Sequence, residues 1–277
     1  MSKKADCCFA IKSYTLNDRM KDYARQLHTA KQKGYALGGV SDFWLDQKDS
    51  GPLVVLRHDV DVMKIGVEET LRIEQSLGAK ATYYFRWSSA DDQTVSFVKK
   101  AGFEVGLHFE TLALLAEERR LSDPMDVTAE ILSEAKGRLK DEIKLFRERF
   151  DVPCRTIASH GHTANYRIQM SNNQLIGPDD YSFFDIDLEA YDSRLLNLFD
   201  CYISDSPPHH NGGWRYGMTL TEACEKRINT ICFLSHPNNW FFSTEIRLLS
   251  LVRIALKGVV RKEEVFHSCF PSAAGRE

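Results

Sequence analysis

The chain has 277 residues, of which 43% are hydrophobic and 27% are charged. This is enough apolar material for one large domain with its own core, or at most two small ones. A formal net charge of -3 provides no bulk field for nucleic acid or an anionic membrane surface, so any charged partner must be recognised locally.

Two further classes of protein are disfavoured. No stretch approaches the roughly 20 consecutive apolar residues of a transmembrane helix, and the N-terminus lacks the apolar core of a secretory signal. The seven cysteines are odd in number and irregularly spaced, which favours free thiols over a disulfide framework. We therefore expect a cytoplasmic protein without a transmembrane segment or a nucleic-acid partner. The sequence carries no signal of an oligomeric state.

The first expected element is an amphipathic helix over residues 15–33, where apolar residues recur every three or four positions and Gly34 follows as a stop. A polar connection over residues 38–52 comes next. From residue 53 onward, short apolar runs alternate with helical segments: VVLRHDVD, VEETLRIEQSLG, ATYYFRW, DQTVSFVKKAG and EVGLHFE. Such alternation predicts βαβ units and a parallel sheet.

The second half of the chain continues this pattern less regularly. We expect a long helix over 127–150, strands in TIASHG, YSFFDIDL, CYISDS and TICFLSHP, and helices in TLTEACEKR and STEIRLLSLVRIALKG. About seven parallel strands with crossover helices are typical of a closed barrel of roughly 250 residues. An open doubly wound sheet is the alternative, but no Gly-rich phosphate loop follows the first strand, as a nucleotide-binding version requires.

Five of the apolar runs end in a histidine or an acid. The residues at these ends are His58, Asp59, Asp61, His108, Glu110, His160, Asp205 and His236. In a parallel barrel these ends lie on the one face that carries active sites. Imidazoles with one or two carboxylates form a ligand set suited to Zn²⁺ or a similar divalent ion. The sequence therefore predicts a metal site with spare groups for a general base and a general acid.

Several of these stretches, taken in order, resemble the polysaccharide deacetylase family, also called the NodB-homology or carbohydrate esterase 4 (CE4) group. They are RHDVD, ATYYFRW, AGFEVGLHFE, SHG, a strand containing DS, and LSHP. The chain looks most like a divergent branch found in bacterial surface-polysaccharide gene clusters. The resemblance implies an α/β fold, a distorted (β/α)7–8 barrel, that removes acyl groups from sugars with one divalent metal. It implies a single domain over 1–277, with a core over 53–240 and an N-terminal helical extension over 12–50.

Carried over by position, the resemblance implies that Asp59 is the general base and Asp61 a metal ligand, or that the two exchange roles. Val60 separates them, a variant that resembles the branch deformylating a lipid-linked amino sugar. Because residues two apart on a strand point the same way, both carboxylates are expected to face the pocket. His108 matches the first histidine of the second motif, but Leu112 stands where the second histidine should be.

The resemblance leaves a third metal ligand to be found. His160 is the expected replacement, with Glu110 as the alternative. His236 matches the closing histidine, which acts as an acid, and Asp205 matches the segment that orients it. His58 alternates with the first acid on its strand and is expected to point away from the pocket.

Substrate contacts are expected from further residues, which are Arg57, Glu110, Trp214, Arg215 and Trp240. Arg57 either tunes Asp59 by ion pairing or is an ordinary barrel salt-bridge residue. Trp214 and Arg215 lie in a loop that could stack on a sugar or grip a carboxylate. Trp240 is expected to shape the pocket wall.

The leading hypothesis is a metal-dependent hydrolase that removes an acetyl, formyl or similar N-acyl group from an amino sugar. The sugar would belong to a bacterial surface polysaccharide, such as a lipopolysaccharide O-antigen, or to its precursor. Zn²⁺ is the expected ion, with Mn²⁺, Co²⁺ and Fe²⁺ as alternatives. A hydrolase of a small non-sugar amide is a second hypothesis. The third hypothesis is a degenerate family member that binds carbohydrate without turnover. A shared ion position for Asp61, His108 and His160 would favour the two enzyme hypotheses over this one.

Overall fold

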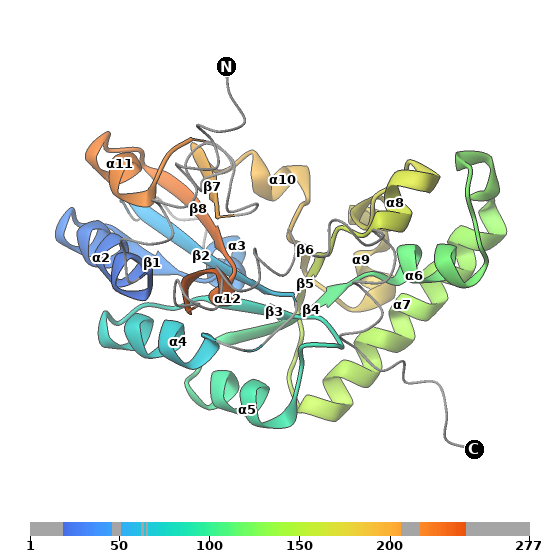
Figure 1. Cartoon of the computed structure of the whole chain (residues 1–277), viewed down its shortest axis with the longest axis horizontal. Coiled ribbons are helices and arrows are strands. Elements are labelled where there is room, and N and C mark those ends of the chain that lie inside the picture. Colours follow the sequence, from blue (N-terminus) through green and yellow to red (C-terminus); the bar gives the residue numbers. More distant parts are fainter. Residues whose placement is uncertain (1–18, 46–50, 62–63, 65, 206–216, 242–277) are drawn as a thin grey trace, which may run out of the picture. The chain divides into compact units, whose positions relative to one another are not determined.

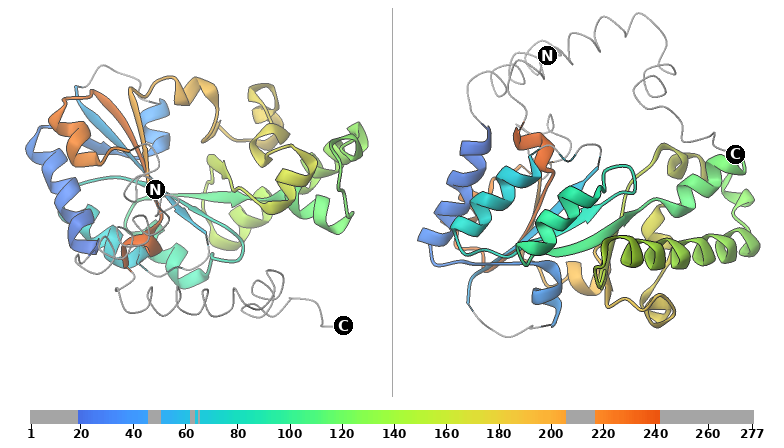
Figure 2. Two further views of the ribbon diagram at one scale, coloured as in Figure 1. Left: turned by 45° about the horizontal axis from the view of Figure 1, so that its top comes forward. Right: turned by 90° about the horizontal axis from the view of Figure 1, so that it is seen from below.

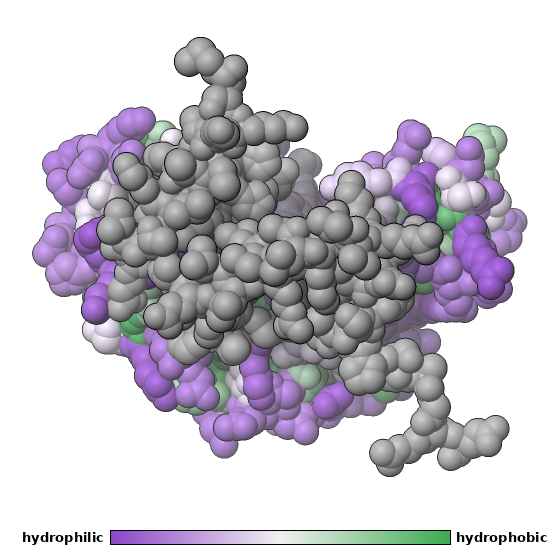
Figure 3. Space-filling model, viewed as in Figure 1, coloured by the Kyte–Doolittle hydropathy of each residue, from purple (hydrophilic) through white to green (hydrophobic). Residues whose placement is uncertain are grey.

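The structure is a computed structural model that describes residues 19–45, 51–61, 64, 66–205 and 217–241. The described residues belong to one compact unit, Arg19–Phe241. The helix expected in STEIRLLSLVRIALKG lies outside them. No described helix combines the length and the apolar composition that a bilayer crossing requires. On the face shown in Figure 3, the described surface is mostly hydrophilic.

The centre of the fold is a curled parallel sheet. Its strands are β1 (Ala36–Gly38), β2 (Leu53–Val60), β3 (Thr82–Phe85), β4 (Glu104–Phe109), β5 (Thr156–Ser159), β6 (Leu188–Glu189), β7 (Cys201–Ser204) and β8 (Thr230–Ser235). They lie in the order β6-β5-β4-β3-β2-β8-β7, with β1 also paired to β2. Every described ladder is parallel. The predicted parallel α/β sheet is confirmed, but among the described residues no ladder joins β6 to β7, so the sheet is open and the closed barrel is not seen.

Helices alternate with these strands along the chain. The longer ones are α2 (Arg19–Gln32), α4 (Val67–Ser76), α5 (Asp92–Lys100), α6 (Thr111–Glu118) and α7 (Ala129–Phe150). The shorter ones are α3 (Val40–Leu45), α8 (Thr163–Ile168), α9 (Tyr181–Phe184), α10 (Ser193–Leu196), α11 (Leu220–Glu225) and α12 (Pro237–Phe241). Three 3₁₀ turns are η1 (Pro124–Asp126), η2 (Asn172–Leu175) and η3 (Pro178–Asp180). The helices α11, α2, α4, α5 and α7 are neighbours in this order (Figures 1 and 2).

The first helix illustrates how the sequence pattern sets these elements. Its buried residues Tyr23, Gln26, Leu27 and Ala30 recur every three or four positions, which places them on one face of α2. After the helix, Gly34 takes a left-handed φ of 88°, a conformation that glycine adopts without steric cost. The predicted helix and its stop are therefore confirmed, with Arg19 as the first described residue.

Two local expectations are wrong, and one helix was missed. The connection over 38–52 contains the end of β1 and all of α3. Helix α6 was not expected, because its start has no side-chain cap to mark it. The expected strand over 181–188 is instead α9 followed by the two-residue β6, since Tyr181 and Phe184 are buried at a helical spacing and Asp185 turns left-handed with φ 53°.

Candidate metal centre

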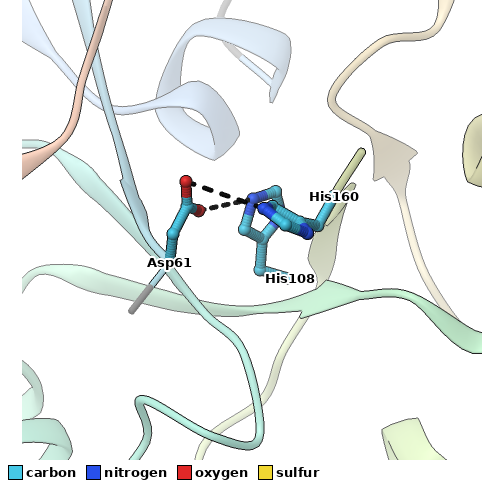
Figure 4. A group of neighbouring side chains, drawn as sticks. All are labelled: Asp61, His108 and His160. Carbon is cyan, nitrogen blue, oxygen red and sulfur yellow. Dashed lines mark ion pairs between the residues drawn. The ribbon is translucent and has the colours of Figure 1, made fainter. Parts of the chain in front are cut away.

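Three side chains from the ends of β2, β4 and β5 meet at one rim of the sheet (Figure 4). Asp61 directly follows β2, His108 lies near the end of β4, and His160 directly follows β5. Because all these strands are parallel, their carboxyl ends lie along one rim of the sheet. Each of the three residues offers one ligand atom, and these atoms all lie within 4.8 Å of one another.

The distances between these atoms suit a shared ion. Asp61 Oδ1 lies 3.2 Å from His108 Nε2, and Asp61 Oδ2 lies 3.7 Å from His160 Nε2. Two ligands at about 2.1 Å from a tetrahedral Zn²⁺ are about 3.4 Å apart. Asp61 Oδ1 is buried and accepts no hydrogen bond, a costly state for a carboxylate oxygen unless a cation contacts it. The residues present therefore fit a divalent ion.

The two histidines have their other ring nitrogens already engaged. His108 Nδ1 lies 2.9 Å from the carbonyl oxygen of Ala158, and His160 Nδ1 lies 2.8 Å from Glu110 Oε1. In a neutral imidazole both partners require the proton on Nδ1, which leaves the Nε2 lone pair free for a metal. Both rings thus present the correct nitrogen to Asp61.

A second carboxylate, Asp59, lies beside the centre in different surroundings. The Arg57 guanidinium donates to both of its oxygens, at 2.9 Å and 2.8 Å, and its Oδ2 lies 3.4 Å from His108 Nε2. Burial alone would raise the pKa of Asp59, but the charge of Arg57 and its hydrogen bonds outweigh it and lower the pKa. Asp59 is therefore an ionised carboxylate in a fixed orientation.

Arg57 is itself enclosed in the interior of the sheet, with only 1% of its surface exposed. Its guanidinium carbon lies 4.2 Å from the ring centre of Tyr191 and 5.4 Å from that of Tyr84. Stacking on aromatic faces is a favourable environment for a buried guanidinium. Next to Tyr84, Gly106 is required on β4, because a Cβ there would lie 2.5 Å from both the Tyr84 ring and the Thr156 carbonyl oxygen.

On the opposite side of the centre, His236 follows β8 and Asp205 follows β7. His236 Nδ1 lies 2.6 Å from Asp205 Oδ1, and the His236 backbone N–H donates to Asp205 Oδ2 at 3.0 Å. His236 Nε2 points to the centre, 3.5 Å from Asp61 Oδ2. Burial opposes protonation of His236, but the charges of Asp205 and Asp61 raise its pKa to about 9. The raised pKa favours the protonated ring at neutral pH.

These residues form the floor of a cavity of about 480 Å³. Its remaining lining is formed by Ser159, Gly161, His162, Thr163, Tyr166, Ser171, Asn172, Asn173, Tyr191, Ser204 and Leu234. Most of these side chains carry hydroxyl or amide groups, and no lysine or arginine is among the described lining residues. Such a wall suits an uncharged ligand rich in hydroxyl groups.

The structure brings most of the predicted site residues together. Those lining the cavity are Asp59, Asp61, His108, His160 and His236, and Asp205 contacts the last of these.

Three expected substrate contacts, Arg57, Glu110 and Trp240, are not among the residues that line the cavity. Glu110 lies behind the cavity wall, where it contacts His160 and Arg86. Trp240 packs 5.4 Å from the ring of Tyr23 on α2, because α12 begins at Pro237 and turns the indole into the core. The expected loop contacts Trp214 and Arg215 lie outside the described residues.

Other residues of the site were missed. Arg86, which follows β3 in the run ATYYFRW, looked like part of an aromatic core segment, although a charge at a strand end is the signal that marked the other site residues. Tyr166 and Tyr191 carry no such signal. His58 lies on the other face of β2, as strand alternation predicts, and contacts Glu74 and Ser235.

Comparison with known proteins yields structural matches alone. No protein-family model and no curated protein matches the chain. Among solved structures, one match is a wild-type CE4 family pseudoenzyme from Bacillus anthracis, with a TM-score of 0.43 and 13% identity over 78% of this chain. Another is a mutant of that protein with restored enzymatic activity, with a TM-score of 0.42 and 13% identity over 76% of this chain. The aligned parts cover 64% and 65% of the two solved chains, less than two thirds of either.

Proposed function

We propose that the chain is a metal-dependent hydrolase that removes an N-acyl group, such as acetyl or formyl, from an amino sugar of a bacterial surface polysaccharide or its precursor. The observation that supports this most is the shared ion position of Asp61, His108 and His160. An ionised carboxylate and a protonated imidazole flank that position, which are the two further groups that amide hydrolysis requires.

A divalent ion, with Zn²⁺ the best fit to one carboxylate and two imidazoles, would be held by Asp61, His108 and His160 and would supply a Lewis acid for the acyl carbonyl. Asp59 accepts a proton from the attacking water. Arg57 donates to both oxygens of Asp59 and so keeps this carboxylate from rotating away. His236 donates the proton on Nε2 to the departing nitrogen as the C–N bond breaks. The products are a carboxylic acid and a free amine.

The lining of the cavity supports a sugar as the group that carries the amide. Hydroxyl and amide side chains on one wall can exchange hydrogen bonds with sugar hydroxyls. Tyr166 is 85% exposed at this wall and offers an aromatic face on which a sugar ring can stack.

A carbohydrate-binding protein without turnover is the second candidate. The observation that favours it is Leu112, which is fully buried on α6 at the position where the CE4 resemblance implies a metal-binding histidine. The two candidates differ in a single outcome: the metal-loaded chain either releases free amine from N-acetyl or N-formyl amino sugars or binds them unchanged.

Two substitutions separate the base from the ligands. Asp59→Asn is expected to abolish amine release and leave about one metal ion per chain, because Asp59 is not among the three grouped ligands. His160→Ala is expected to lower the metal content, because it removes one of them. Elemental analysis and an amine-release assay measure both. Turnover that survives Asp59→Asn would refute the assigned base, and unchanged metal content in His160→Ala would refute the assigned ligand.

A further inference from the structure

We propose that Arg86 and Glu110 form a positioning pair that sets the affinity of the metal centre, by holding His160 and the backbone of Asp61 at a fixed separation. The inference rests on the metal centre of the proposed function and does not depend on hydrolysis.

The order of strands places Arg86 between the ligands. The strands β2, β3, β4 and β5 are consecutive neighbours in the sheet, and the ligands Asp61, His108 and His160 come from the ends of β2, β4 and β5. The end of β3 supplies none of them. Arg86 follows β3 directly, so it starts from the gap between the ends that carry Asp61 and His108.

From this gap Arg86 reaches both sides. Its Nη1 donates to the carbonyl oxygen of Asp61 at 3.0 Å. Its Nε and Nη2 contact Glu110 Oε2 at 2.8 Å and 2.6 Å. Glu110 Oε1 in turn contacts His160 Nδ1 at 2.8 Å. One chain of charge-assisted hydrogen bonds thus connects the backbone of the first ligand to the ring of the third across four strand ends.

This connection has a definite effect on His160. A carboxylate at Nδ1 fixes the proton there, orients the ring and makes Nε2 a stronger donor to a metal. Only one oxygen of Glu110 contacts His160, and Arg86 holds the other, so the carboxylate cannot rotate away. The role requires the planar fork of a guanidinium, because a lysine ammonium cannot contact Glu110 and the Asp61 carbonyl in the same geometry.

His160 needs this support more than His108 does. The His108 ring is 2% exposed and its Nδ1 contacts the backbone of the neighbouring strand, whereas the His160 ring is 20% exposed and its Nδ1 contacts a side chain. Glu110 and Arg86 therefore determine how firmly the His160 ring is held in its orientation.

The test measures Zn²⁺ affinity by competition with a chromophoric chelator. Glu110→Ala and Arg86→Met are each expected to weaken Zn²⁺ binding about 10- to 100-fold. Glu110→Gln is expected to keep part of the affinity, because its amide oxygen can still accept from His160 Nδ1. Arg72→Met is the control, since Arg72 is an exposed residue of α4 whose acidic partners among the described residues are Glu68 and Glu69.

The Glu110→Ala substitution, made in the His160→Ala variant, separates an effect that acts through His160 from a general loss of stability. If Glu110 acts through His160, adding Glu110→Ala to His160→Ala costs little further Zn²⁺ affinity. Zn²⁺ binding by Glu110→Ala and Arg86→Met equal to wild type, or an equal loss from Glu110→Ala in both backgrounds, would overturn the inference. Zn²⁺ binding that follows these expectations in a chain without amine release would remove the proposed function and leave the positioning pair intact.

Discussion

Asp59 and Asp61 are two residues apart, yet their surroundings give them different chemistry. Asp59 shares both oxygens with Arg57, while Asp61 faces imidazole nitrogens and has one buried oxygen without a hydrogen bond. The guanidinium of Arg57 already compensates the negative charge of the Asp59 carboxylate. The carboxylate of Asp61 faces nitrogen lone pairs, which do not compensate its charge, whereas a bound metal ion would. The surroundings therefore favour Asp61 as the ligand and Asp59 as the base, an alternative that sequence alone left open.

At the same scale, Asp205 is expected to set the protonation of His236. Asp205→Asn removes the negative charge that raises the pKa of His236 to about 9, so the pKa falls and the ring loses its proton at a lower pH. An NMR titration of the metal-free chain measures this directly. In a pH profile of amine release, the alkaline limb is expected to move to lower pH, because the proposed acid is the protonated ring. An unchanged His236 titration would contradict the role of Asp205, and Asp185→Asn at an exposed position serves as the control.

Residues at strand ends could be predicted, and their cross-strand partners could not. Apolar runs that end in His or Asp identified Asp59, Asp61, His108, His160 and His236, because parallel strands bring such ends to one rim. The roles of Arg86 and Tyr191 depend on which strands are neighbours in the sheet. No local sequence pattern encodes this order. The direction of Trp240 could not be foreseen for the same reason, since it is set by packing on α2.

Strand β2 organises polar groups on both of its faces. Opposite the metal centre, His58 contacts Glu74 of α4 at 2.5 Å and Ser235 of β8 at 2.8 Å. The hydroxyls of Tyr23 and Tyr83 also donate to Glu74, at 2.5 Å and 2.7 Å. The groups join two helices and three strands around one carboxylate without exposure to water.

Removal of Glu74 is expected to be strongly destabilising. Glu74→Ala leaves His58 and two tyrosine hydroxyls buried without their partner, at a cost of about 3–5 kcal/mol in the free energy of unfolding. Glu68→Ala, which breaks an exposed pair with Arg72 on the same helix, is the control and is expected to cost less than about 1 kcal/mol. Urea unfolding measures both. Equal stability of the two variants would show that Glu74 contributes no more than a surface charge.

Elements with a clear period were predicted, and those without one were missed. The runs of β2, β4 and β8 are short and mostly apolar with a histidine or an acid at or just after the carboxyl end, and α2 and α7 have helical spacing over many residues. The segments of α6 and α9 are short and rich in apolar residues, so a helix and a buried strand look alike there. Their state is decided by tertiary packing.

At the scale of the whole molecule, a partly buried carboxyl predicts how stability changes with pH. Burial and the negative charge of Glu110 raise the pKa of Glu142 to about 7, although a hydrogen bond from Thr111 opposes the shift. The folded state then holds the proton more tightly than the unfolded state, in which the carboxyl has a pKa of about 4.3. The contribution of Glu142 is full below that pH and is lost as pH rises towards 7.

Glu142→Gln isolates this contribution, because the amide oxygen can still accept from Thr111 and never ionises. The variant is expected to match wild type near pH 4 and to be more stable by about 1–3 kcal/mol near pH 8. Urea unfolding at the two values measures the difference. A variant that is no more stable than wild type at the higher pH would show that Glu142 ionises freely in the folded chain.

The position of β8 between β2 and β7 has a consequence for how the protein is made. Leu53–His58 pairs with Thr230–Ser235, so a ribosome delivers one strand long before its neighbour. Until β8 arrives, β2 is an unprotected edge, and the Asp205–His236 pair cannot form opposite Asp61. Pairings so distant in sequence slow folding and prolong exposure to aggregation. The side of the site that holds His236 therefore forms only after nearly the whole described chain has been synthesised, whereas Asp61, His108 and His160 are all present once residue 160 has been added.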